Sequence, residues 1–341
     1  MKGFVSSRLH PLANLGLLVV LLLATFCVAS FLVMVLNYLA FGVGMQDMGN
    51  VTQRPADYPN GWAVSMLSQG VLLLGGLGGA ALALAALTGN KLADYFMPRR
   101  PVPAGWPLLA GLLIVASLPA MSVLIAWNAS WGLPEWAMTK EQQAKDILKF
   151  LTNFSSPLRF GVAVLVMAVV PAVSEELFFR GVLQRNLVQW AGRHVGIWLA
   201  AIVFSAIHLQ FQGFVPRFVL GLGLGYLYEW SRNILVPIAA HFAQNGFQLL
   251  LLYLQQRDWS SSGFDPDSTE ALPWYWVLLS MAVCTVGLWY LHRRMSAPQA
   301  DALPTEMHTL GSHGVAVSRP ALVPPAARTL SHDGVDATKA D

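Results

Sequence analysis

Three short patterns of ionisable and polar residues stand inside long apolar segments of this sequence. They are Glu175-Glu176-x-x-x-Arg180, Phe204-x-x-x-His208 and His241-x-x-x-Asn245. An ionisable side chain inside a membrane span costs about 2.5–3.5 kcal/mol on insertion scales, so such groups are rare and are functional hypotheses by default. Their clustering on three neighbouring segments predicts a polar site within apolar surroundings.

A glutamate, two histidines and an asparagine are sufficient for hydrolysis of an amide by water. A carboxylate can take a proton from water, imidazole can share that task or protonate the leaving amine, and N–H groups can stabilise the oxyanion. The same residues can also hold a metal, because Glu175, His208 and His241 would give three ligands and an open position for water, as in catalytic zinc centres. The sequence does not separate these two mechanisms.

The spacing within the first motif predicts a local ion pair. Glu176 and Arg180 lie four residues apart and therefore share one face of a helix, where they can form a buried pair that fixes helix packing. Glu175 is rotated away from that face and has no arginine of its own. Because His208 also lacks an acidic partner in its own segment, we expect Glu175 and His208 to meet across a water-filled cavity.

The composition identifies the solvent of these segments as a bilayer. The chain has 341 residues, of which 55% are hydrophobic and only 11% charged, whereas soluble domains carry about 25% charge. The mean hydropathy is +0.53. The net charge of +3 without a polybasic run gives no indication of a nucleic-acid partner. Cys27 and Cys284 lie far apart in apolar segments, which excludes a disulfide framework and a Cys-rich zinc site.

Eight apolar blocks are candidates for transmembrane helices, which need about 20 residues each. They cover residues 12–41, 62–87, 105–127, 158–190, 195–209, 214–230, 234–254 and 274–291. The predicted fold is an all-α polytopic membrane protein with about eight transmembrane helices. From residue 296 onward Pro, Ala, Ser, Thr and Gly dominate, which predicts a disordered cytoplasmic C-terminal tail.

Lysine and arginine residues near the block ends predict the orientation, because cytoplasmic loops carry an excess of them. Lys2 and Arg8 place the N-terminus in the cytoplasm, and eight crossings return the tail to that side. The loop with Lys140 and Lys145 does not fit this threading. Residues 139–154 are better interpreted as an amphipathic helix on the membrane surface, since apolar residues recur there at helical spacing.

The predicted orientation places the candidate site residues at different depths in the membrane. Glu175 and His241 fall in the cytoplasmic half of their helices, whereas His208 falls nearer the outside if its helix is straight and perpendicular. We therefore expect the helix of residues 195–209 to be tilted or to start below the membrane surface, next to a polar cavity open toward the cytoplasm.

Two glycine-rich runs have a simpler interpretation. They are Gly75-Gly76-x-Gly78-Gly79 and Gly221-x-Gly223-x-Gly225. Neither follows a strand, as a phosphate-binding loop would, so they predict close packing of helices.

In its three motifs the sequence resembles the CAAX protease and bacteriocin-processing family of intramembrane endopeptidases, which includes CAAX prenyl endopeptidase-like and abortive-infection-like proteins. These proteins carry Glu-Glu-x-x-x-Arg, Phe-x-x-x-His and His-x-x-x-Asn on successive core helices. All three patterns occur here in order, and the resemblance covers about residues 158–253. Each motif alone is a weak signal, whereas three in order on three apolar segments are specific.

The resemblance implies an all-helical fold of eight spans, a catalytic cavity in the membrane and peptide-bond hydrolysis. By position, Glu175 would activate water, His208 would be its partner, and His241 with Asn245 would form the oxyanion or metal side. Glu176, Arg180 and Phe204 would support them. Members are often described as metalloproteases, which implies a divalent metal such as zinc, although the residues also permit a metal-free glutamate mechanism. Family substrates include prenylated C-terminal CAAX tails and bacterial peptide or protein precursors, and nothing in this sequence selects among them.

The expected protein is a multi-pass endopeptidase of the plasma (inner) membrane with both termini cytoplasmic. Its expected partners are membrane lipid and a peptide or membrane-anchored protein. We divide it into N-terminal helices (1–157), a catalytic core (158–255), an external loop with the last helix (256–295) and the tail (296–341). A proton- or ion-coupled transporter would use the same residue types, but the sequence shows no inverted repeat or matching pair of broken helices. A catalytically silent scaffold is the third hypothesis.

Overall fold

The computed structural model describes residues 9–89, 91–96, 102–257 and 269–296, and in these residues it contains helices and no strands. The all-α fold predicted from the sequence is confirmed. All described residues belong to one compact unit, Met1–Ala297. The predicted disordered tail beyond residue 296 and the N-terminal residues Lys2 and Arg8, which oriented the topology, lie outside the described residues.

The helices follow the apolar blocks. The first part of the chain forms α1 (Pro11–Phe41), α2 (Met45–Gln53), η1 (Pro55–Asp57), α3 (Gly61–Leu72), η2 (Leu73–Gly78), α4 (Gly79–Leu87), α5 (Leu92–Phe96), α6 (Gly105–Ala116), α7 (Leu118–Ala129) and α8 (Glu135–Leu151). The second part forms α9 (Pro157–Val164), η3 (Leu165–Val169), α10 (Val170–Phe178), η4 (Phe179–Gln184), α11 (Arg185–Ala191), α12 (Arg193–Ala206), α13 (Phe214–Ser231), α14 (Leu235–Gln256) and α15 (Trp274–Ser296). The π-helical stretches η2, η3 and η4 continue their neighbours, so α3–α4 and α9–α11 are long helices of 27 and 35 residues.

The predicted count of eight crossings is not confirmed. Within the described ranges, five helices are long and apolar enough to cross a membrane, or six if α6 and α7 form one bent span. Helix α12 has 14 residues, which at about 1.5 Å per residue is about 21 Å. It is shorter than the hydrocarbon core of about 30 Å.

The third apolar block is bent rather than straight. Helices α6 and α7 meet at Ser117 with an angle of 45°. Pro119 explains the break, because it has no N–H for the carbonyl of Val115 and its ring crowds the preceding turn.

The helix α9–α11 carries the first motif, and its ends are specified locally. Ser156 accepts a hydrogen bond from the backbone N–H of Arg159 at 3.3 Å, and Pro157 occupies the first turn, where its missing N–H costs nothing. Pro171 cannot donate to the preceding turn, and the stretch before it, η3, is π-helical. The helix ends before Gly192, whose φ of +85° favours glycine.

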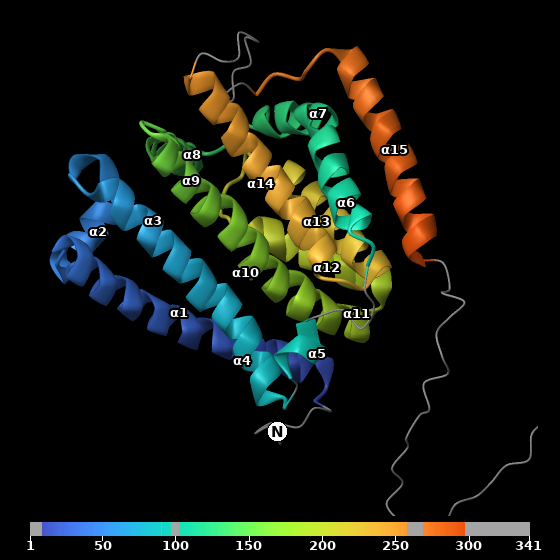
Figure 1. Cartoon of the computed structure of the whole chain (residues 1–341), viewed down its shortest axis with the longest axis horizontal. Helices are drawn as coiled ribbons and strands as arrows, with labels where there is room; N and C mark the ends of the chain where they lie inside the picture. The colour runs from blue at the N-terminus through green and yellow to red at the C-terminus, as the bar shows by residue number, and fades with distance from the viewer. Residues whose placement is uncertain (1–8, 90, 97–101, 258–268, 297–341) are drawn as a thin grey trace, which may run out of the picture. The chain divides into compact units, whose positions relative to one another are not determined.

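Helices that are distant in sequence meet around α10. Helix α10 packs against η2 on one side and α14 on the other, while α12 packs against α13 and η4 (Figure 1). Helix α14 also packs against α6. This arrangement brings together the helices that carry the three motifs.

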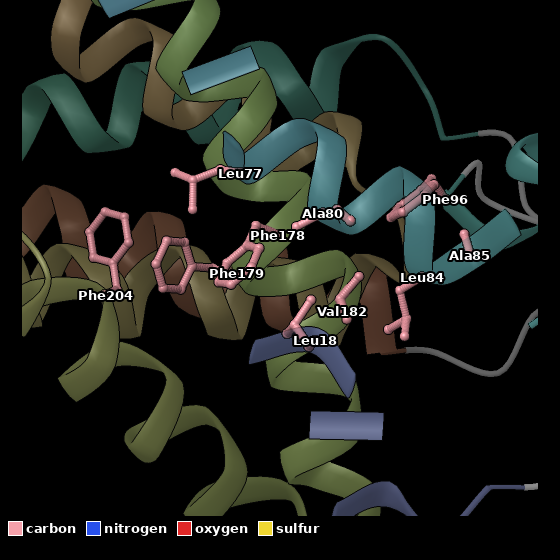
Figure 2. Packing of buried hydrophobic residues seen from close by; sticks show 11 residues of the cluster. Leu18, Leu77, Ala80, Leu84, Ala85, Phe96, Phe178, Phe179, Val182 and Phe204 are labelled. Carbon is pink, nitrogen blue, oxygen red and sulfur yellow. The ribbon is translucent and has the colours of Figure 1, made fainter. Parts of the chain in front are cut away.

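A cluster of buried apolar side chains supports this arrangement. It joins α1, η2, α4, α5, α10, η4 and α12, and Figure 2 shows Phe179 beside Phe204 in it. Their ring centroids are 5.1 Å apart. A Cβ added at Gly76 would lie 2.7 Å from the ring of Phe26, and one at Gly221 would lie 3.2 Å from Phe204. The predicted role of the glycine runs in close helix packing is confirmed.

The predicted amphipathic helix forms as α8, which begins and ends a few residues earlier than expected. Its C-terminal carbonyl, on Leu151, accepts a hydrogen bond from Trp62 Nε1 on α3 at 2.9 Å. Its location on a membrane surface stays a prediction.

An apolar groove of about 450 Å³ lies between α3–η2 and the α9–η3–α10 segment. Its lining runs from Trp62 to Leu74 on one side and from Val162 to Val170 on the other, and none of the candidate site residues lines it. This groove is therefore not the predicted catalytic cavity, which stays a prediction.

Candidate active site

Glu176 lies at the centre of a buried hydrogen-bond network. Its side chain is fully buried, and its Oε1 accepts hydrogen bonds from Arg180 Nη1 at 2.8 Å and from His241 Nδ1 at 2.9 Å. The ion pair predicted from the spacing of Glu176 and Arg180 is confirmed. The bond to His241 joins α10 to α14, a contact that no spacing within one helix could reveal.

Arg180 extends this network to two further helices. Its Nη2 donates to the carbonyl of Gly221 on α13 at 3.0 Å. Its guanidinium lies over the ring of Phe204 on α12, 4.7 Å from the centroid. The side chain is 2% exposed, so its charge is balanced by Glu176 and by these polar and aromatic contacts.

Glu175 faces His241 without pairing tightly with it. Its Oε2 lies 4.0 Å from His241 Nε2 and forms no hydrogen bond with any described residue, although the atom is buried. Because Nδ1 of His241 donates to Glu176, the neutral ring presents the lone pair of Nε2 toward Glu175. The structure thus brings Glu175, Glu176 and His241 together.

Phe204 and His208 complete one side of the site. The ring of Phe204 is buried, with its centroid 5.3 Å from that of His208 and 5.9 Å from that of His241. Nδ1 of His208 donates to the carbonyl of Phe204 at 2.8 Å, so the neutral ring offers Nε2 as an acceptor. In the described part of the chain, Glu175 and His208 share no direct hydrogen bond or ion pair, and the histidine beside Glu175 is His241.

Asn245 lies one helical turn beyond His241 on α14, with a partly buried side chain. It forms no hydrogen bond with another described residue. Its amide therefore stays available on the same face of α14 as the imidazole of His241.

The loop that presents His208 is held by residues that the sequence did not single out. Glu141 on α8 is buried and accepts hydrogen bonds from the backbone N–H groups of Phe211 and Gln212. Asn128 Oδ1 on α7 accepts one from the backbone N–H of Val215 at 3.0 Å. Glu141 stands four residues after Ala137, which is also buried, so both lie on the same face of α8. This helical spacing is the sequence feature that could have identified Glu141.

A left-handed backbone conformation occurs in the same loop. Leu209 has φ of +53°, which is uncommon for a residue with a side chain and carries a cost of about 1–3 kcal/mol. Strain of this kind persists where surrounding contacts determine the backbone, and the bonds from Glu141 are such contacts.

The expected metal ligands were Glu175, His208 and His241. Among the described residues, no three His, Cys, Asp or Glu side chains are arranged so that they could hold a metal ion. Nδ1 of His241 is engaged by Glu176, and Nδ1 of His208 by a backbone carbonyl.

Comparison with known proteins matches the region of the three motifs to one protein family. Residues 157–247 match the model of the family described as type II CAAX prenyl endopeptidase Rce1-like. The resemblance inferred from the motifs is confirmed over these residues. The uncharacterized protein YpbD of Bacillus subtilis (strain 168) is 34% identical over 83 residues, which span 23% of this chain and 40% of that relative. No solved structure matches this chain significantly.

Proposed function

We propose, from the match of residues 157–247 to a family of membrane endopeptidases, that this chain hydrolyses a peptide bond of a membrane-associated peptide or protein, in CAAX-like processing. The observation that supports the proposal is the buried pair of Glu175 and His241, with the far nitrogen of the imidazole bonded to Glu176. A buried carboxylate oxygen needs a hydrogen-bond donor, and water is the donor that hydrolysis requires.

In the proposed reaction, a water lies between Oε2 of Glu175 and Nε2 of His241. Glu175 accepts a proton from this water as the oxygen attacks the carbonyl carbon of the peptide bond. The same proton then passes from Glu175 to the leaving nitrogen as the C–N bond breaks. The immediate products are a carboxylic acid and an amine, and transfer of the acid proton to the amine gives a carboxylate and an ammonium group, so atoms and protons balance.

Glu176 and Arg180 act on the imidazole of His241. The bond from Nδ1 to Glu176 fixes the ring orientation and the tautomer, and it stabilises positive charge on the ring if Nε2 takes up a proton. Arg180 holds Glu176 in place by pairing with it. These two residues are therefore positioning residues in the proposed mechanism.

The oxyanion of the tetrahedral intermediate needs donors that are already in place. Asn245 is the candidate, because its side-chain amide follows His241 on one face of α14. His208 presents Nε2 as an acceptor in its neutral form, so we assign it to the attacking water or to the N–H of the leaving amine. The expectation that His208 and Glu175 meet across a water stays a prediction.

A metalloprotease mechanism is the alternative at this site. In it, Glu175, His208 and His241 would hold zinc, and zinc would supply a more acidic water as the nucleophile. Dialysis against a strong chelator separates the two mechanisms. The glutamate mechanism predicts unchanged hydrolysis, whereas loss of hydrolysis that added zinc restores would support the metal.

We also propose that the protein resides in the plasma (inner) membrane with both termini cytoplasmic and with its site accessible from that side. The support is the distribution of basic residues along the sequence. Its partners would be membrane lipid and the peptide or membrane-anchored substrate.

The function is tested with the full chain purified in detergent and incubated with a panel of quenched peptides. Time-dependent cleavage that scales with protein concentration is expected. The rival function, proton- or ion-coupled transport, predicts solute counterflow in liposomes and no cleavage. Counterflow without cleavage would replace the proposal.

A further inference from the structure

Arg217 on α13 is a partly buried cation beside the candidate site. Its Nη2 donates to Oε1 of Gln210 at 2.7 Å. Its Nη1 is buried and has no hydrogen-bond partner among the described residues. The guanidinium thus retains a donor that points into protein rather than into bulk solvent.

Arg217 lies close enough to the candidate catalytic residues to interact with their charges. It interacts electrostatically with Glu175, His208 and Glu141. None of these groups lies within ion-pair distance of it in the described ranges. Glu141 directs Oε1 to the backbone of the 207–213 loop instead.

The loop holds this guanidinium closely. A Cβ at Gly213 would lie 2.7 Å from Nη2 of Arg217, so the side chain folds back close to the backbone of the loop. Gln210 and Gly213 stand on the loop that Glu141 fixes from α8. The orientation of Arg217 is therefore set by the same contacts that present His208.

A buried donor without a partner and a charge without a close counter-ion both favour an anionic ligand. Guanidinium groups match carboxylates in geometry and charge. We propose that Arg217 binds a carboxylate of the peptide substrate close to the scissile bond. This carboxylate is a free C-terminus or an Asp or Glu side chain. The inference rests on the proposed function and adds a specificity-determining residue to it.

The test compares peptides that differ only in this charge. One pair carries a C-terminal acid or amide, and a second pair carries an internal Glu or Gln. In the wild-type protein, the acidic member of one pair should be cleaved with a kcat/KM about 10- to 100-fold higher, as a charge-assisted hydrogen bond would give. The pair that shows the preference identifies the source of the carboxylate.

Arg217→Gln should reduce that preference to about one, and Arg217→Lys should retain part of it, because only the charge is kept. Arg159→Gln is the matched control. Arg159 is a partly buried arginine over the ring of Trp62 and away from the site, so this variant should keep the wild-type preference.

A second readout does not depend on turnover. Binding of the same peptides to Glu175→Gln protein should favour the acidic member about tenfold or more, and the additional change Arg217→Gln should abolish the difference. Equal binding and equal cleavage of the acidic and neutral peptides would overturn the inference while leaving peptide hydrolysis intact. Absence of cleavage with a binding preference that depends on Arg217 would instead contradict the proposed function alone.

Discussion

Substitution of Arg180 by alanine is expected to destabilise the fold strongly. In the native protein its guanidinium contacts three groups: the carboxylate of Glu176 on its own helix, the carbonyl of Gly221 on α13 and the ring of Phe204 on α12. Arg180→Ala leaves Glu176 as a buried carboxylate whose remaining partner is His241, and it removes the donor from the carbonyl of Gly221.

The size of the expected stability loss follows from the burial of Arg180 and Glu176, whose side chains are 2% and 0% exposed. Removing one member of a buried pair costs about 3–5 kcal/mol, because the other charge stays desolvated. At about 2–4 °C per kcal/mol, the expected decrease in Tm is roughly 6–20 °C.

Thermal unfolding of the detergent-purified protein measures this decrease, with Arg185→Ala as the control. Arg185 stands on the same long helix and donates to the carbonyl of Tyr95 at 2.8 Å. The control should lose about 1–2 kcal/mol, because it removes one hydrogen bond and a cation–π contact with the ring of Tyr95. The double variant Glu176→Gln/Arg180→Ala should recover part of the lost stability, since no carboxylate is left unpaired. Equal decreases in Tm for Arg180→Ala and Arg185→Ala would contradict a special cost of breaking the buried ion pair. Wild-type stability with abolished turnover would place Arg180 in the reaction itself.

Two further predictions concern the frame of the site. Glu141→Ala should loosen the 207–213 loop, because the carboxylate of Glu141 accepts hydrogen bonds from backbone N–H groups there. Limited proteolysis should cut the loop at least about tenfold faster, which is the effect of losing a charge-assisted hydrogen bond. An unchanged proteolysis rate would contradict this role of Glu141. Gly196→Ala should lower Tm through a cost of about 1–3 kcal/mol, because its Cβ would lie 2.5 Å from the backbone nitrogen of Val188. Gly161→Ala, with nothing within 4 Å of the added Cβ, is the control, and an equal Tm for the two variants would speak against close packing of α11 and α12.

Local patterns predicted much of the site. The spacing of Glu176 and Arg180 on a helix was sufficient to predict their ion pair, because residues four apart share a face. The lengths of the apolar blocks likewise predicted nearly all the longer helices, including the short apolar segment that became α12.

Contacts between helices could not be predicted in the same way. The partner of Glu175 depends on how α10 and α14 are rotated against each other, and helical periodicity does not specify that rotation. Among the described residues, the apolar blocks that became α12 and α13 are not among the helices long and apolar enough to cross a membrane, so the number of apolar blocks exceeds the number of candidate spans. Glu141 looked like one charge among several on an amphipathic helix, and only the fold shows that it faces the 207–213 loop.

In the proposed mechanism, Glu175 activates water for peptide hydrolysis. The most direct measurement is the hydrolysis rate of a cleaved peptide by Glu175→Gln, expressed per molecule of folded protein. Glutamine keeps the shape of the side chain but cannot accept the proton, so the rate should fall by about 10²–10⁴-fold with Tm retained. Glu229→Gln is the matched control. Glu229 stands on α13, away from the helix of Glu175, and is a buried carboxylate that pairs with Arg232 at 2.6 Å. A Glu175→Gln rate within about threefold of wild type, well short of a general base's contribution, would contradict the claim.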